Sequence, residues 1–268
     1  MTISSTFMAT DGDNYELTMG RWSHRLAPLF LDFVGLEGAA SILDVGCGTG
    51  HLAAEASRRV PSAEVHAVDL SPVYIEHAKT RYSYPRLTFD VGDACALSYP
   101  DKSFDRVLSL LVLHFVPRTL DALVEMHRVA KSGAVVGAAV WDVRGGFVAS
   151  RMFFDTAAIL DARAAALRAK NYTRPMTRPG ELAAAWRAAG FCDVAETSLQ
   201  IRMEFESFAD YWAPYLGTEG PVAEYVASLA EEERARLEAA VRAAYLDGEP
   251  DGPRSYAALA WAVKGTVL

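Results

Sequence analysis

Short apolar runs alternate with amphipathic segments along the first half of the chain. The runs are rich in valine, isoleucine and leucine and end at turn residues, which is typical of strands buried on both faces. These predicted strands lie at 41–45, 65–70, 87–91, 134–141 and within 105–116. Apolar residues three and four positions apart predict helices in the segments between them, at about 51–59, 72–79 and 119–131. The alternation favours an α/β fold whose parallel sheet is covered on both sides.

Capping residues predict where some of these helices begin and end. Ser71 followed by Pro72 predicts an N-cap and a first helical residue, and Thr119 predicts another N-cap. The pair Ser132 and Gly133 predicts the end of the helix that starts near Thr119.

The second half of the chain is alanine-rich and predominantly helical. Its predicted helices lie at 151–168, 180–189, 207–216, 221–229 and 231–245. Two strand-like runs, at 194–205 and 256–263, are predicted to be the last two strands of the same sheet. We expect the helices inserted around these strands to form a lid.

Composition and charge narrow the class of protein. The chain has 268 residues, of which 51% are hydrophobic, so it can bury a large core without disulfides. Its formal net charge of −8 argues against broad binding to nucleic acids or anionic membranes. The most apolar run, 107–116, is far shorter than the ~20 residues of a membrane span. The first residues lack the basic-then-apolar pattern of a signal peptide.

The cysteines point to a reducing compartment and to no metal centre. Cys47, Cys95 and Cys192 are scattered and show neither a disulfide framework nor a zinc-ligand spacing. We therefore expect a cytoplasmic protein.

A glycine-rich turn after the first strand carries the strongest chemical signal. The pattern Gly46-x-Gly48-x-Gly50 lies between a predicted strand and a predicted helix, so backbone N–H groups can closely approach a ligand. Asp69 ends the next strand, where a carboxylate can accept two hydrogen bonds from a ribose diol. NAD enzymes share both features, but their glycines follow a G-x-G-x-x-G spacing, which this chain lacks.

Five segments resemble, in chain order, the signatures of class I S-adenosylmethionine-dependent methyltransferases. They are ILDVGCGTG (42–50), VDLSPVYIEHAK (68–79), VGDACALSYPDKSFDRV (91–107), LHFV (113–116) and HRVAKSGAVV (127–136). The set is most similar to the type 11 group, which includes quinone-biosynthesis C-methyltransferases. The segments MGRWSHRLAP and AWAVKG resemble a bacterial branch of that group.

The resemblance implies a Rossmann-like sheet of seven strands, mostly parallel, with the last strand antiparallel. Residues 1–145 would form the cofactor-binding half, and residues 146–268 would complete the sheet and supply the helical lid. The cofactor would be S-adenosyl-L-methionine, with S-adenosyl-L-homocysteine as the product, and no metal is implied.

The resemblance also assigns residues to the methionine end of the cofactor. Asp44 would reach its amino group, and Arg21, on a short N-terminal helix, would bind its carboxylate. Leu110, at the tip of the fourth strand, would lie near the sulfonium. The loop beneath the methionine part would consist of Gly46, Cys47, Gly48 and Gly50.

The nucleoside end is assigned in the same way. Asp69 would bind the ribose hydroxyls, and Leu70 would lie beside the adenine. Tyr74 would lie on the adenine face, Asp93 would accept from the adenine amino group, and Ala94 would supply a backbone contact.

His114 is the candidate catalytic base because it follows the fourth strand, where the acceptor should lie; the alternative is a packing residue. His51 is expected on a helix surface. Trp141 and Asp142 end the fifth strand and are candidates for touching the acceptor. Aromatic residues on or beside the expected lid helix predict either core packing or an apolar acceptor pocket: Phe205, Phe208, Tyr211, Trp212 and Tyr215.

Taken together, the sequence predicts methyl transfer to the O, N or C atom of a small, apolar or aromatic acceptor. A non-catalytic cofactor-binding or regulatory protein is an alternative, as are an NAD-dependent oxidoreductase and another reaction on the same fold. The fourth strand is followed by LLVLHF and by no N-P-P-Y element, which argues against methylation of nucleic acid bases.

Overall fold

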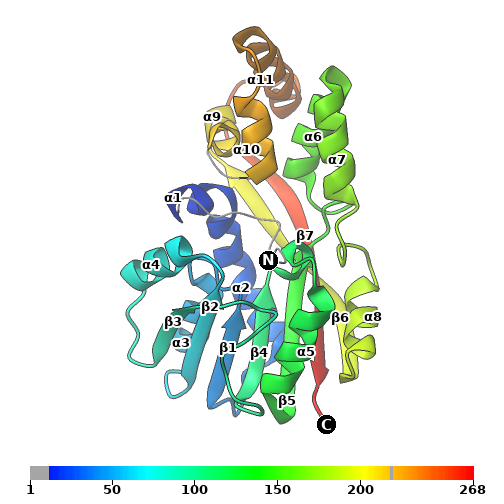
Figure 1. Cartoon of the computed structure of the whole chain (residues 1–268). Coiled ribbons are helices and arrows are strands. Elements are labelled where there is room, and N and C mark those ends of the chain that lie inside the picture. Colours follow the sequence, from blue (N-terminus) through cyan, green and yellow to red (C-terminus); the bar gives the residue numbers. More distant parts are fainter. Residues whose placement is uncertain (1–11, 218–219) are drawn as a thin grey trace.

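A seven-stranded mixed sheet organises the computed structural model, which describes residues 12–217 and 220–268 (Figure 1). The strand order is β3-β2-β1-β4-β5-β7-β6, and only β7 within this sheet runs antiparallel to its neighbours. The strands are β1 (Ser41–Val45), β2 (Glu64–Asp69), β3 (Leu87–Val91), β4 (Phe104–Leu110), β5 (Ala130–Trp141), β6 (Cys192–Phe205) and β7 (Arg254–Thr266). The predicted sheet, with its last strand antiparallel, is confirmed.

Fourteen helical segments of the described chain surround this sheet. They are α1 (Gly12–Tyr15), the π-helix η1 (Glu16–Gly20), α2 (Arg21–Val34), α3 (His51–Arg59), α4 (Pro72–Arg81), the 3₁₀ helix η2 (Leu113–Phe115), α5 (Thr119–Val129), α6 (Val148–Leu160), α7 (Ala162–Tyr172), α8 (Glu181–Ala188), α9 (Phe208–Trp212), the 3₁₀ helix η3 (Ala213–Leu216), α10 (Gly220–Ala227) and α11 (Glu231–Leu246). Ser71 caps α4 as predicted, since its hydroxyl accepts from the Tyr74 N–H at 3.2 Å. No helix in these ranges is long and apolar enough to cross a membrane.

Alternate residues of the central strand face two separate hydrophobic layers. Ile42 of β1 packs in the cluster that includes Phe30 of α2, whereas Leu43 packs in the cluster that includes Leu123 of α5. Trp186 of α8 lies in the second layer and donates from its indole N–H to the Val136 carbonyl at 3.0 Å. The sheet is therefore covered on both faces, as the unbroken apolar strands predict.

Two expected helix boundaries are wrong. The helix expected to run to residue 131 ends at Val129, because Ala130 already pairs with Phe104 of β4 as the first residue of β5. Thr119 does not cap this helix: it is the first helical residue, and its hydroxyl donates to the Val116 carbonyl at 2.7 Å.

The single helix expected at 151–168 is also wrong. Asp161 is extended and divides the segment into α6 and α7, and its carboxylate accepts from the Arg163 N–H at 2.8 Å. An aspartate that caps a helix in this way offers the backbone an alternative to continuous helix.

The helices expected as a lid lie beyond the carboxyl ends of the parallel strands (Figure 1). β6 and β7, with 14 and 13 residues, are the longest strands of the sheet and reach up into this helical layer. α6 and α7 follow β5, and α9, α10 and α11 are inserted between β6 and β7. α8 is separate, since it packs low on the sheet.

Candidate functional site

The glycine loop forms the floor of the candidate site. Gly46, Gly48 and Gly50 have positive φ angles of 76°, 54° and 90°. The N–H groups of Gly46 and Cys47 both donate to the Val68 carbonyl, at 2.7 and 2.9 Å, which ties the loop to β2. A Cβ on Gly46 would lie 2.5 Å from both methyl groups of Val112. Backbone angle and close packing therefore both require glycine here.

Two carboxylates follow the ends of adjacent strands beside this loop. Asp69 accepts from the Gly48 N–H and the Ser71 N–H, both at 2.9 Å. Burial raises the pKa of Asp69, although these backbone donors oppose the rise. Asp93 follows β3 and accepts from the Cys95 N–H at 2.8 Å. The structure thus places two of the predicted nucleoside-binding carboxylates along one edge of the sheet.

Asp44 is a buried carboxylate with one free oxygen. It is 1% exposed, and its Oδ2 accepts from the Ala53 N–H at 3.1 Å, whereas its Oδ1 has no hydrogen-bond partner. Burial, with a contribution from the nearby Asp69 charge, raises the pKa of Asp44 to about 8. An unpartnered buried carboxylate oxygen fits the amino group of a ligand, because a cation there would compensate its charge.

The raised pKa of Asp44 predicts a stability effect that depends on pH. The folded protein keeps a proton that the unfolded chain releases, so the Asp44 side chain destabilises the fold as the pH rises from about 4 towards 8. We expect Asp44→Asn, which cannot ionise, to raise the free energy of unfolding by about 1–3 kcal/mol at pH 8 and hardly at all at pH 4. Urea unfolding at both pH values measures this.

Asp105 supplies a control of opposite sign. Burial alone would raise its pKa, but hydrogen bonds from Lys131 and Ser41 outweigh burial and lower the pKa to about 2. The stability that this carboxylate contributes is present above the unfolded pKa and is lost as the pH falls towards 2, so Asp105→Asn should destabilise the fold at neutral pH. An equal effect of Asp44→Asn at pH 4 and pH 8 would contradict the burial argument.

The segment α1–η1 lies over the glycine loop. The hydroxyl of Tyr15 is 3.0 Å from the position of a Cβ on Gly48, and its ring centroid is 4.7 Å from that of Tyr74. The Glu16 carboxylate accepts from the Thr49 hydroxyl at 2.5 Å and contacts the His51 ring at 3.0 Å. Burial alone would raise the pKa of Glu16, but these hydrogen bonds outweigh it and lower the pKa to about 2.

Glu16 explains why the position expected for His51 is wrong. His51 was expected on a helix surface and is instead 4% exposed, because Glu16 and the hydroxyl of Tyr82 cover its two ring nitrogens. Arg81 of α4 also pairs with Glu16, at 2.6 Å. No motif indicates these contacts, since Glu16 and His51 are 35 residues apart.

The remaining predicted cofactor residues lie around the same edge. Tyr74 is 4% and Leu110 7% exposed, whereas Leu70 is 45% exposed. Ala94 follows Asp93 and packs against the hydrophobic layer beneath. Cys47 is buried, and burial raises the pKa of its thiol well above the ordinary value, as expected of a small residue that fills the loop.

Arg21 begins a helix of 14 residues, not the short helix that was expected. Its Nη1 donates to Asp210 of α9 at 2.8 Å, and its guanidinium lies 4.3 Å from the ring centroid of Trp22. The Nε and Nη2 atoms are buried and have no hydrogen-bond partner. Arg21 therefore joins the N-terminal helix to the lid and retains free donors for an anionic group.

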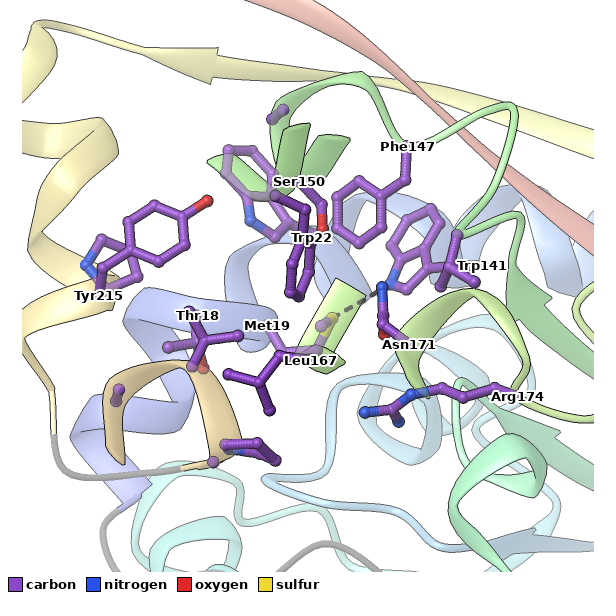
Figure 2. Close-up of a pocket in the computed structure, with 18 of the residues that line it drawn as sticks. Thr18, Met19, Trp22, Trp141, Phe147, Ser150, Leu167, Asn171, Arg174 and Tyr215 are labelled. Atoms are coloured by element: carbon purple, nitrogen blue, oxygen red, sulfur yellow. Dashed lines mark hydrogen bonds between the residues drawn. The ribbon is translucent and has the colours of Figure 1, made fainter. Parts of the chain in front are cut away.

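A cavity of about 460 Å³ lies between the sheet edge and the lid. Figure 2 shows Trp22, Trp141 and Phe147 along it, with Tyr215 on the opposite side. The volume falls within the range of ordinary small-molecule sites. Of the lid aromatics considered above, these three line the cavity: Phe205, Tyr211 and Tyr215. Phe208 and Trp212 pack in the core instead, and Asp142 caps a turn by accepting from the Arg144 and Gly145 N–H groups.

His114 lines this cavity and is 6% exposed. Its Nδ1 has no hydrogen-bond partner, and its ring centroid is 4.0 Å from that of Phe115. Burial, and secondly the charge of Arg174, lower the pKa of His114 to about 3. The imidazole is therefore neutral in the free protein at ordinary pH, with one nitrogen available to an acceptor.

Residues 42–133 match the family profile described as a methyltransferase domain. This segment contains the glycine loop, Asp69, Asp93 and His114, and the sheet around it has the strand order given above. This segment resembles a methyltransferase domain. No group of three or more potential metal ligands occurs among the residues that the structure describes.

Curated relatives match this chain over part of their length. The malonyl-[acyl-carrier protein] O-methyltransferase of Halorhodospira halophila is 42% identical over 97 residues, covering 35% of this chain and 33% of that protein. The ubiquinone/menaquinone biosynthesis C-methyltransferase UbiE of Desulfotalea psychrophila is 33% identical over 120 residues, covering 45% and 48%. The alignments thus span about a third to a half of these relatives.

Solved structures share the fold over nearly the whole chain. Phosphoethanolamine N-methyltransferase 2 of Haemonchus contortus, in complex with S-adenosyl-L-methionine, has a TM-score of 0.57 at 16% identity, covering 97% of this chain and 61% of that one. The [4+2]-cyclase SpnF has a TM-score of 0.54 at 20% identity, covering 100% and 88%. The class I methyltransferase fold is confirmed.

Proposed function

We propose that this protein transfers a methyl group from S-adenosyl-L-methionine to a small-molecule acceptor held in the lid cavity. The observation that carries the proposal is the free, buried Oδ1 of Asp44 beside the glycine loop, on the same edge as Asp69 and Asp93. Asp44 would hold the cofactor's amino group, Asp69 its ribose and Asp93 its adenine. When bound, the cofactor supplies an electrophilic methyl group on a sulfonium sulfur.

The residues of this chain would act chiefly by aligning the acceptor with the methyl group of the cofactor. Methyl transfer is an in-line displacement. Holding the two reactants in the right orientation can lower its activation free energy by on the order of 7–11 kcal/mol. Trp22, Trp141 and Phe147 give the cavity an apolar wall, and His114, which follows β4, also lines it. The acceptor would thus meet the cofactor at the end of β4, where Leu110 lies.

His114 remains the candidate catalytic residue, but its lowered pKa makes it a weak base and favours a hydrogen-bonding role. A neutral imidazole can accept a hydrogen bond from an acceptor O–H or N–H and orient the attacking atom. We expect His114→Ala to lower kcat about tenfold, as the loss of one orienting hydrogen bond would, with a smaller change in KM. His114→Gln, which keeps a hydrogen-bonding group, should restore part of the loss.

The pH profile of kcat separates this role from that of an exposed histidine. With a pKa near 3, His114 should produce no inflection between about pH 6 and pH 8. Unchanged turnover in His114→Ala would remove this residue from the site.

Glu16 is expected to control how long the cofactor stays bound. Because its carboxylate ties η1 to Thr49 and Arg81, Glu16→Ala should release this segment from the glycine loop. We expect the dissociation rate of S-adenosylhomocysteine, followed by stopped-flow tryptophan fluorescence, to rise about tenfold. Glu76→Ala, which removes an exposed carboxylate of α4, is the control and should change nothing. A rate equal in both variants would show that α1–η1 does not retain the cofactor.

Product analysis tests the proposal itself. The protein is incubated with S-adenosylmethionine and pools of small acids, phenols and amines, and the mixture is analysed by mass spectrometry. The proposal predicts S-adenosylhomocysteine together with a product heavier by one methylene group. Because the fold is shared with a cyclase, acceptor conversion without S-adenosylhomocysteine would instead indicate another reaction. Cofactor binding without any turnover would favour a regulatory protein.

A further inference from the structure

The lid cavity has an unusual charge for a protein of net charge −8. Its lining includes Arg21, Lys170 and Arg174, but no aspartate or glutamate. Arg21 is paired with Asp210 through Nη1, and its remaining donors are those expected to bind the cofactor's carboxylate. Lys170 and Arg174 form no ion pair with the residues that the structure describes.

Arg174 lies where a ligand could reach it. It follows α7, it is half-buried, and its guanidinium is 4.4 Å from the ring centroid of Phe115. Burial alone lowers its pKa, and no neighbouring carboxylate opposes that shift. Its side chain donates no hydrogen bond within the described ranges. Leaving a guanidinium partly desolvated and unpaired is costly, and a bound anion would remove that cost.

The neighbouring groups extend this polar end of the cavity. Figure 2 shows the Arg174 and Asn171 side chains on one side, beside Trp141, and Tyr215 on the other. The amide of Asn171 can donate to the same anion, and Lys170, which is exposed, adds a positive charge at the rim. The rest of the lining is chiefly aromatic and aliphatic.

We propose that the acceptor is an amphipathic anion, whose carboxylate or phosphate is bound by Arg174 with help from Lys170 and Asn171, and whose apolar body fills the aromatic part of the cavity. This inference rests on the proposed function, since it names the class of acceptor for the same site. A planar guanidinium binds either oxyanion through paired hydrogen bonds.

The test is direct binding of matched probes to the cofactor-free protein, by calorimetry. Octanoate, octyl phosphate and octanol share one apolar body and differ in the head group. We expect one or both anions to bind about tenfold or more tightly than octanol. Tighter binding of octanoate would indicate a carboxylate acceptor, and tighter binding of octyl phosphate a phosphorylated one.

Two variants test whether Arg174 is the group that binds the anion. Arg174→Gln should weaken binding of the preferred anion about tenfold, leaving octanol binding unchanged. Arg187→Gln removes an exposed arginine of α8 that does not line the cavity, and it should change neither affinity. S-adenosylhomocysteine should bind Arg174→Gln normally, which also confirms that the variant is folded.

Three results would overturn the inference. The first is that octanol binds as tightly as both anions. The second is that neither anion binds at millimolar concentration. Arg174→Gln could also weaken S-adenosylhomocysteine as much as the anion, which would place Arg174 in the cofactor site. Failure of the methyltransferase proposal is seen separately, as absence of S-adenosylhomocysteine binding in the unaltered protein, whatever the probes do.

Discussion

Replacing Asp69 by alanine is expected to weaken the binding of S-adenosylhomocysteine about 100-fold, or by about 3 kcal/mol. The change would remove the carboxylate that we propose accepts from both ribose hydroxyls. It would also free the N–H groups of Gly48 and Ser71, which now donate to Asp69 at 2.9 Å. The glycine loop would thus lose one of its ties to the end of β2 at the same time as the ligand loses its partner. Calorimetric titration measures the effect.

Two further variants isolate the carboxylate. Asp69→Asn keeps one acceptor oxygen. Its affinity for S-adenosylhomocysteine should lie between those of the alanine variant and the unaltered protein. Asp90→Ala makes the same substitution at an exposed position of β3 and should leave the affinity unchanged. Unchanged affinity in a folded Asp69→Ala protein would remove the ribose assignment.

Gly46→Ala is expected to lower the free energy of unfolding by about 3 kcal/mol. Part of the cost is the positive φ of 76°, which a residue with a Cβ adopts unfavourably. The larger part is steric, because the new methyl group would lie 2.5 Å from both methyl groups of Val112. The loop must then move away from the end of β4, so cofactor binding should be lost as well.

Gly190→Ala is the matched control for this prediction. Gly190 has a φ of 89°, but a Cβ there would meet nothing within 4 Å, so only the backbone cost of about 1–2 kcal/mol applies. Combining Gly46→Ala with Val112→Ala should recover part of the steric loss, seen as a favourable coupling energy in urea unfolding. Equal destabilisation at Gly46 and Gly190 would contradict the packing argument.

Much of the sheet could be predicted because each strand carries its own signal. The runs at 41–45 and 87–91 match β1 and β3 residue for residue, since buried strands flanked by turns are local features. The two errors have different causes, a tertiary strand pairing at Ala130 and a local helix cap at Asp161. Ala130 continues into β5 because it pairs with Phe104, and Asp161 interrupts an alanine-rich helix by capping α7.

Some residues of the candidate site could be predicted from the sequence, and others could not. The glycine loop, Asp69 and Asp93 follow strand ends, so their shared edge could be predicted from the order of strands alone. Arg174 could not be predicted, because its segment has no periodic pattern and meets Phe115 only in the folded chain. The contacts of Glu16 with Thr49 and His51 could not be predicted for the same reason.

Calorimetric titration of the unaltered protein with S-adenosylhomocysteine, using NAD as the comparison ligand, tests the central claim most directly. The account predicts one binding site of about micromolar affinity for S-adenosylhomocysteine and no heat of binding with NAD. Binding of NAD, or no binding of S-adenosylhomocysteine, would contradict it, because the glycine loop and the carboxylates of Asp44 and Asp69 would then serve a different ligand.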